Sequence, residues 1–149
     1  MPTVERVARN DTGLASELRL SVMRLRRRLA NEREPGNQLS IASMSVLASL
    51  FRYGHLTVGE LAANERVQPP SMTRHVNALE EDGFVTKRPH ETDGRVVVVE
   101  LTTQGRDRVL ADRRRRDEWL ARQLRDLTAE ERDVLRAAAP LIQRLAEEA

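Results

Sequence analysis

The stretch that decides the fold is residues 57–105, TVGELAANERVQPPSMTRHVNALEEDGFVTKRPHETDGRVVVVELTTQG. Thr57 and Glu60 have the T-x-x-E spacing of a capping box, which predicts a helix starting at Thr57. A second helical pattern covers 69–81, and two strands follow around a charged tip at 89–94. Helix, turn, helix and a two-stranded wing, in that order, form an arrangement that grips duplex DNA.

Length and composition favour one compact domain with helical extensions. The chain has 149 residues, 40% of them hydrophobic and 3% aromatic, so aliphatic side chains must dominate the core. It has no signal-peptide pattern and no apolar run near the roughly 18 residues that a membrane span needs. The absence of cysteine excludes disulfides, thiolate metal sites and thiol redox switching. These features predict a soluble cytoplasmic protein.

The charge balance alone does not indicate a nucleic-acid partner. The whole chain has 25 basic and 23 acidic residues, a net charge of +2. Residues 57–105 have five basic and eight acidic side chains, a net charge of −3. A prediction of DNA binding therefore depends on where a few arginines point.

Apolar stripes predict helices on both sides of the central unit. Before it, residues 14–29 carry apolar side chains at steps of three and four, and a second helix covers 40–53. After it, a long polar helix covers 102–124, and a capping box at Thr128 starts a final helix. Pro140 is expected to kink or restart that final helix.

We therefore predict a mainly α protein with a small β-wing. A winged helix-turn-helix domain at 39–101 lies between an N-terminal arm and dimerisation helix at 1–38 and C-terminal dimerisation helices at 102–149. The apolar stripe at 109–124 is too narrow for burial inside one subunit, so a homodimer with C₂ symmetry is the natural way to cover the flanking helices. The alternative is a monomeric bundle that packs the same stripes internally.

The outer face of the helix at 69–81 is the first candidate DNA-binding site. If Met72, Val76 and Leu79 face the core, 100° per residue turns Arg74 nearly opposite to it. Arg74 is long enough to reach base edges in the major groove, and the first turn suits a phosphate. The alternative is a solvated arginine on an outward face. The candidate contact residues are Pro70, Ser71, Thr73, Arg74, His75 and Asn77.

The wing is the second candidate site, with Arg88, Asp93 and Arg95 as its residues. Arg95 can enter the minor groove, where narrow walls concentrate negative potential. Asp93 would repel DNA unless it pairs with an arginine, either Arg88 or Arg95. Gly94 permits a tight tip with a positive φ. The alternative for Arg95 is a surface arginine at the end of a strand.

Neither a catalytic nor a metal-binding group emerges. His55, His75 and His90 are far apart in the sequence, and there is no cysteine, His-x-x-x-His pair or glycine-rich phosphate loop. We predict no cofactor, no metal and no enzymatic activity. The arginine run 113–116 is best interpreted as a solvated face, because acidic neighbours beginning with Asp112 neutralise much of it.

These blocks resemble the MarR family of winged helix-turn-helix transcriptional regulators. The resemblance implies a triangular homodimer, formed by the terminal helices, that binds pseudo-palindromic DNA operators and acts as a repressor. Carried over by position, the resemblance implies that Ser71, Thr73 and Arg74 belong to the recognition helix. It likewise places Asp93 and Arg95 in the wing. The blocks that carry it, in order and at family spacing, are LTxxELA at 56–62, SMTRHVxxLExxGFV at 71–85, DGR at 93–95 and LTxxG at 101–105.

One position departs from the family, and one partner is implied by it. Relatives often have a second arginine directly after the wing aspartate, where this chain has Gly94, so the tip would make one fewer charged contact. Many relatives are released from DNA by small phenolic or other aromatic anions, which implies such an inducer here. Residues of suitable types, each also suited to core or surface, are Arg19, Met44, Phe51, Arg52, Tyr53 and His55.

A second function competes with DNA binding. A winged-helix module can mediate protein association without reading DNA, and the net charge of −3 in residues 57–105 is the best support for it. A site protected on the DNA upstream of the protein's own gene would favour DNA binding. No protected site at low salt would favour the protein-interaction module.

Overall fold

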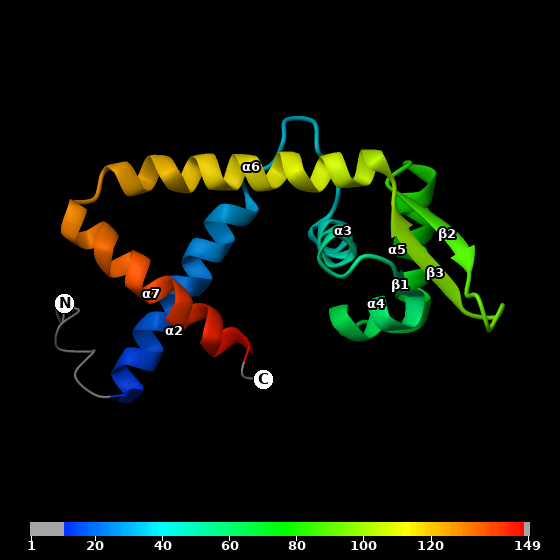
Figure 1. The fold of residues 1–149 in the computed structure, drawn as a ribbon, viewed down its shortest axis with the longest axis horizontal. Helices are drawn as coiled ribbons and strands as arrows, with labels where there is room; N and C mark the ends of the chain where they lie inside the picture. Colours follow the sequence, from blue (N-terminus) through cyan, green and yellow to red (C-terminus); the bar gives the residue numbers. More distant parts are fainter. Residues whose placement is uncertain (1–10, 148–149) are drawn as a thin grey trace. The chain divides into compact units, whose positions relative to one another are not determined.

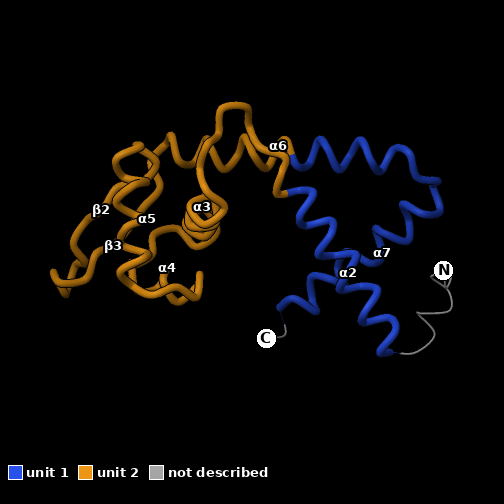
Figure 2. The backbone as a smooth tube through the Cα atoms, turned by 180° about the vertical axis from the view of Figure 1, so that it is seen from behind, with its two compact units in different colours: residues 1–29, 116–149 blue, residues 30–115 orange. Residues whose placement is uncertain are grey.

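The computed structural model describes residues 11–147, and the predicted N-terminal arm at 1–10 lies outside them. The chain divides into two compact units (Figure 2). The winged unit is Ala30–Arg115, and the helical unit combines Met1–Leu29 with Arg116–Ala149.

The winged unit has the predicted order of helix, turn, helix and wing (Figure 1). The mainly α fold with a small β-wing is therefore confirmed. The elements of this unit are α3 (Ile41–Tyr53), β1 (Leu56–Thr57), α4 (Val58–Glu65), α5 (Pro69–Glu81), β2 (Val85–Pro89), β3 (Val97–Leu101) and the first part of α6 (Thr103–Arg125).

Local capping explains where α4 begins and ends. The Thr57 Oγ1 accepts a hydrogen bond from the Glu60 N–H at 3.0 Å, as the capping-box spacing predicted. The helix ends at Glu65 and is capped by Arg66, whose φ of 54° is left-handed and whose N–H bonds back to the last turn. Pro69 then starts α5, where its missing N–H costs nothing.

The sheet contains one strand that the sequence did not predict. Both β1 and β2 pair antiparallel with β3, in the order β1-β3-β2, so that Leu56 and Lys87 lie on either side of Val99. A strand of two residues shows no alternation of polar and apolar side chains, because a period of two needs more positions. The sequence pattern therefore assigned Leu56 and Thr57 only to the start of α4 and not to a strand.

An aliphatic core joins α3, α4 and α5 to the inner face of the sheet. Leu47, Leu61, Val76 and Val99 are fully buried. Burial of one such side chain contributes about 1.5–3 kcal/mol to the free energy of unfolding. The core therefore fixes the orientation of α5. Its other members are Met44, Val46, Leu50, Leu56, Ala62, Met72, Leu79, Phe84, Val85 and Val109.

A buried carboxylate holds the loop at 31–40 against α6. Asp112 is 0% exposed, and it accepts hydrogen bonds from the Glu34 N–H and the Asn37 Nδ2, both at 2.8 Å. The sequence had suggested that Asp112 neutralises arginines on a solvated face, which is wrong. Its partners lie 78 and 75 residues away, beyond the reach of any helical pattern.

The helical unit consists of α2 (Asp11–Ala30), the rest of α6 and α7 (Ala129–Glu147). The predicted capping box is present, with the Glu131 N–H 3.1 Å from the Thr128 Oγ1 and the Thr128 N–H 2.8 Å from a Glu131 carboxylate oxygen. α7 continues as one helix through Pro140, so it does not restart there. No described residue of α2 or α7 is buried. None of the described helices is both long and apolar enough to cross a membrane.

Candidate nucleic-acid interface

The helix α5 presents the outward face that its sequence predicted. Met72, Val76 and Leu79 are at most 1% exposed and belong to the core. Arg74 is exposed, so it points to solvent rather than inward. The other candidate residues of this helix are the exposed Pro70, Thr73 and Asn77 and the half-buried Ser71 and His75.

Side-chain hydrogen bonds hold the first turns of α5. The Arg74 Nη2 donates to the Ser71 Oγ at 3.3 Å, and the Thr73 Oγ1 donates to the Pro69 carbonyl at 3.1 Å. The guanidinium of Arg74 therefore lies beside the N-terminal half of the helix. Pro69 and Pro70 have no N–H, and the Ser71 and Met72 N–H groups bond to the Gln68 carbonyl, so it is the helix dipole and the Arg74 guanidinium that favour an anion at that end.

The wing tip is closed by short-range hydrogen bonds. The His90 N–H donates to the Val96 carbonyl at 2.9 Å, and the Val96 N–H to the Asp93 carbonyl at 3.0 Å. The Asp93 carboxylate accepts from the Nε of Arg95 at 3.2 Å and from its backbone N–H at 3.1 Å. The side-chain bond and then the backbone bond hold the pKa of Asp93 below its usual value. The Arg95 side chain remains 92% exposed.

Arg88 has another partner. Its Nε lies 3.0 Å from the Glu100 Oε1 on the neighbouring strand. Of the two arginines considered for Asp93, it is therefore Arg95 that pairs with it. Arg88, on β2, remains a candidate contact to DNA.

Gly94 has an ordinary backbone conformation. Glycine permits a positive φ at this tip, but the described glycines that have one are Gly36, Gly54 and Gly83. The hydrogen bonds between His90, Asp93 and Val96 shape the turn without a left-handed residue. A Cβ at position 94 would meet no atom within 4 Å, so a larger side chain fits there.

Gly94→Arg is expected to strengthen DNA binding, because it adds a cation beside Arg95 at an open and unstrained position. One more phosphate contact should steepen the slope of log K against log salt by about 0.9. Titration of a labelled operator at several salt concentrations measures this slope. Gly94→Ala is the matched control, and an equal gain in that variant would contradict the explanation by charge.

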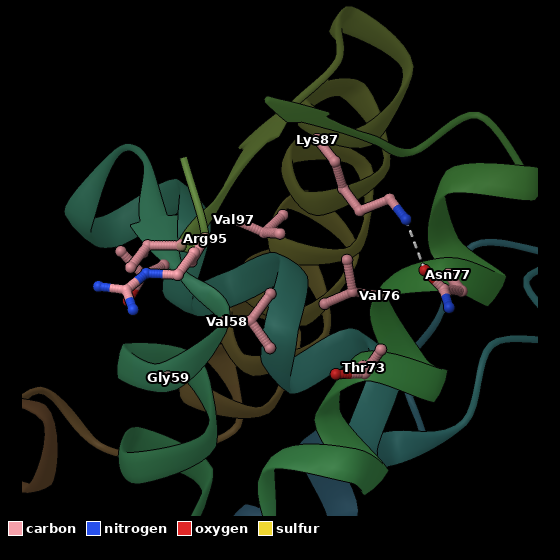
Figure 3. A pocket seen from close by; sticks show the side chains of 10 residues that line it. Val58, Gly59, Thr73, Val76, Asn77, Lys87, Arg95 and Val97 are labelled. Atoms are coloured by element: carbon pink, nitrogen blue, oxygen red, sulfur yellow. Dashed lines mark hydrogen bonds between the residues drawn. The ribbon is translucent and has the colours of Figure 1, made fainter. Parts of the chain in front are cut away.

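A groove of about 470 Å³ lies between α5, the start of α4 and the wing (Figure 3). Its lining includes valine side chains together with Lys87, Asn77 and Arg95. The Lys87 Nζ donates to the Asn77 Oδ1 at 2.6 Å. Lys87 was not predicted from the sequence as a site residue. The available signal was its place on β2, two residues after the buried Val85 and so on the same face of the strand.

Two histidines that are far apart in the sequence line one recess. His55, before β1, and His90, after β2, surround a recess of about 250 Å³ together with Glu60 and Glu91. The pairing of β1 and β2 with β3 brings them together. Among residues 11–147, no three His, Asp or Glu side chains are grouped so as to hold a metal ion.

The residues considered for a small ligand lie in different surroundings. Met44 is buried in the core, and the Phe51 ring is contacted by two arginines of α6, whose Cζ atoms lie 4.3 and 5.1 Å from the ring centroid. Arg19 is on α2, in the helical unit. Arg52 and Tyr53 line a recess of about 390 Å³ whose other residues are Ser45, Ala48, Ser49, Asn64 and Arg113.

Comparison with known proteins identifies relatives along most of the chain. The MarR family model matches residues 39–97, which include α3, α4, α5 and β2. A helix-turn-helix transcriptional regulator of Mycobacterium tuberculosis is 47% identical over 139 residues, which cover 93% of this chain and 96% of the relative. The helix-turn-helix transcriptional repressor MdtR of Bacillus subtilis is 32% identical over 124 residues, 79% of this chain and 78% of MdtR.

Solved structures share the fold of the chain. A crystal structure of a Pseudomonas aeruginosa protein described as a transcriptional regulator matches with a TM-score of 0.81 and 34% identity, covering 95% of this chain and 99% of that one. Streptococcus pneumoniae FabT, crystallised in complex with DNA, matches with a TM-score of 0.67 and 21% identity, covering 93% and 99%. The likeness to FabT concerns the fold alone.

Proposed function

Because the chain belongs to the MarR family of helix-turn-helix transcriptional regulators, we propose that it binds a specific double-stranded operator as a homodimer and represses the adjacent genes. The observation that carries the proposal is the exposed Arg74 on α5, opposite the buried face and in the same unit as the exposed Arg95 of the wing. The first can reach base edges in the major groove and the second the minor groove. The likeness to MdtR supports repression.

The uncovered helices support the homodimer. Met23 of α2 and Val134 and Leu145 of α7 are 53%, 66% and 64% exposed, and neither helix has a buried residue among those described. Apolar stripes of this kind need a second surface to cover them, and C₂ pairing supplies one. We therefore propose residues 39–101 as the DNA-binding domain and 1–38 and 102–149 as the dimerisation segments.

We further propose that the recess on α3 accepts a small aromatic anion that releases the protein from DNA. Two arginines, Arg52 and Arg113, supply positive charge at this recess, and Tyr53 supplies an aromatic face. The Cζ of Arg52 lies 5.2 Å from the centroid of the Tyr53 ring. A carboxylate on a planar ring would complement this combination.

Footprinting on DNA upstream of the protein's own gene tests the proposal. We expect a protected site with two half-sites one helical turn, about 34 Å, apart, and a light-scattering mass of twice the 16.9 kDa chain. Addition of salicylate, a small aromatic anion, should reduce the protection. A monomeric mass would favour the internal helical bundle instead.

The alternative is a protein-interaction module, which the net charge of −3 in residues 57–105 favours. The absence of any protected site at low salt would support it, because phosphate contacts are strongest there. In either case we propose a binding protein without catalytic activity, in keeping with a family of transcriptional regulators.

A further inference from the structure

The only lysine of the chain joins the wing to α5. The Lys87 Nζ on β2 donates to the Asn77 Oδ1 at 2.6 Å (Figure 3). The same Nζ lies 3.4 Å from the Glu80 Oε1. Asn77 and Glu80 are both on α5, about one helical turn apart. The wing therefore fixes the orientation of a side chain on the helix that is proposed to enter the major groove.

The register of the sheet explains the contact. Lys87 lies opposite Val99 of β3, which is fully buried, and two residues beyond Val85, which is 1% exposed. It is therefore on the inner face of β2, against which α5 packs. A lysine can occupy such a position because its aliphatic stem covers apolar surface while the ammonium reaches the edge. Its side chain is 31% exposed.

The hydrogen bond from Lys87 occupies the amide oxygen of Asn77, which is the acceptor end of its side chain. Asn77 follows Thr73 and Arg74 by four and three residues, so the three side chains share the outward face of α5. The Asn77 Oδ1 is turned toward Lys87, and Figure 3 shows the amide nitrogen on the side away from Lys87. Because Asn77 is exposed, this nitrogen is the end that it offers to DNA.

We propose that Lys87 sets the base preference of Asn77 in the major groove. An asparagine that binds adenine uses both ends of its amide, the oxygen toward N6 and the nitrogen toward N7. With its oxygen held by Lys87, Asn77 acts as a donor, which suits O6 and N7 of guanine or O4 of thymine. Lys87 is thus a positioning residue for specificity. The inference rests on the proposed DNA-binding function.

The ion pair with Glu80 distinguishes the positioning role of Lys87 from a simple contact with DNA phosphate. An ammonium group has three donors, and here one bonds Asn77 while the charge faces the Glu80 carboxylate. The positive charge of Lys87 is therefore offset before DNA arrives. Removal of Lys87 should change the choice of base more than it changes the overall affinity.

Selection of binding sites from randomised duplexes, followed by competition titrations, tests the inference. Lys87→Met removes the donor but keeps an aliphatic stem. It should lower discrimination at one base pair of each half-site by about fivefold, with adenine gaining. Asn77→Asp replaces the donor by a second acceptor and should move the preference toward a base with a donor, N4 of cytosine or N6 of adenine.

Glu80→Gln is the matched control, because it removes the ion pair and keeps the bond between Lys87 and Asn77. It should select the wild-type sequence, and thermal unfolding should show that all three variants remain folded. Unchanged base preference in both Lys87→Met and Asn77→Asp would overturn the inference while leaving the proposed function standing. Failure of the wild-type protein to select any sequence would instead overturn the proposed function, and this inference with it.

Discussion

Arg74→Ala is expected to weaken operator binding by about 1–3 kcal/mol and to relax the base preference at one position of each half-site. Arg74 is exposed on α5, and its bond to Ser71 places the guanidinium beside the N-terminal half of the helix. A guanidinium there can donate twice to a guanine, and alanine can donate to none. Fluorescence anisotropy with the operator and with its single-base variants measures both effects.

Arg95→Ala is the comparison that separates base recognition from backbone contact. Arg95 lies at the wing tip. Its replacement by alanine should weaken binding more evenly across DNA sequences. The two variants should therefore differ in specificity even if their losses of affinity are similar. Unchanged binding in both would contradict the assignment of α5 and the wing as the DNA-binding elements.

Gly105→Ala is expected to lower the free energy of unfolding of the winged unit by about 3 kcal/mol or more. A Cβ at this position would lie 2.1 Å from the Phe84 carbonyl oxygen, 3.0 Å from its carbon and 3.1 Å from the Leu101 Cδ2. The oxygen also accepts from the Thr102 N–H at 3.1 Å, so it cannot move away without losing that bond. Urea unfolding followed by circular dichroism measures the loss.

Gly59→Ala is the matched control for Gly105→Ala. Gly59 lies in the first turn of α4, and its added Cβ would make an ordinary contact, 3.8 Å from the Thr57 Oγ1. Alanine is favoured over glycine in helices by up to about 1 kcal/mol, so stability should stay equal or rise slightly. Equal stability of the two variants would show that the close approach at Gly105 relaxes easily.

Much of the fold could be predicted because its signals are local. The capping pairs at Thr57 and Thr128 link residues three positions apart; the box at Thr128 is complete, and at Thr57 the hydroxyl caps the Glu60 N–H. The spacing of Met72, Val76 and Leu79 likewise identified the buried face of α5, and with it the outward side of Arg74. An α-helix turns once every 3.6 residues, so the positions of its apolar residues identify both its buried face and its exposed face.

The pattern of the chain by itself determined the helices, the wing and the exposed face of α5 that we propose as the DNA-binding surface, because capping and periodicity act within one or two turns. Only the tertiary structure decided which distant groups come into contact. These contacts are the pairing of the strand β1, the hydrogen bonds to the buried Asp112, and the hydrogen bond from Lys87 to Asn77. These depend on strand register and on loops closed across many residues, which a short window of sequence does not contain. The proposed contacts to DNA were therefore predictable, whereas the orientation of Asn77 was not.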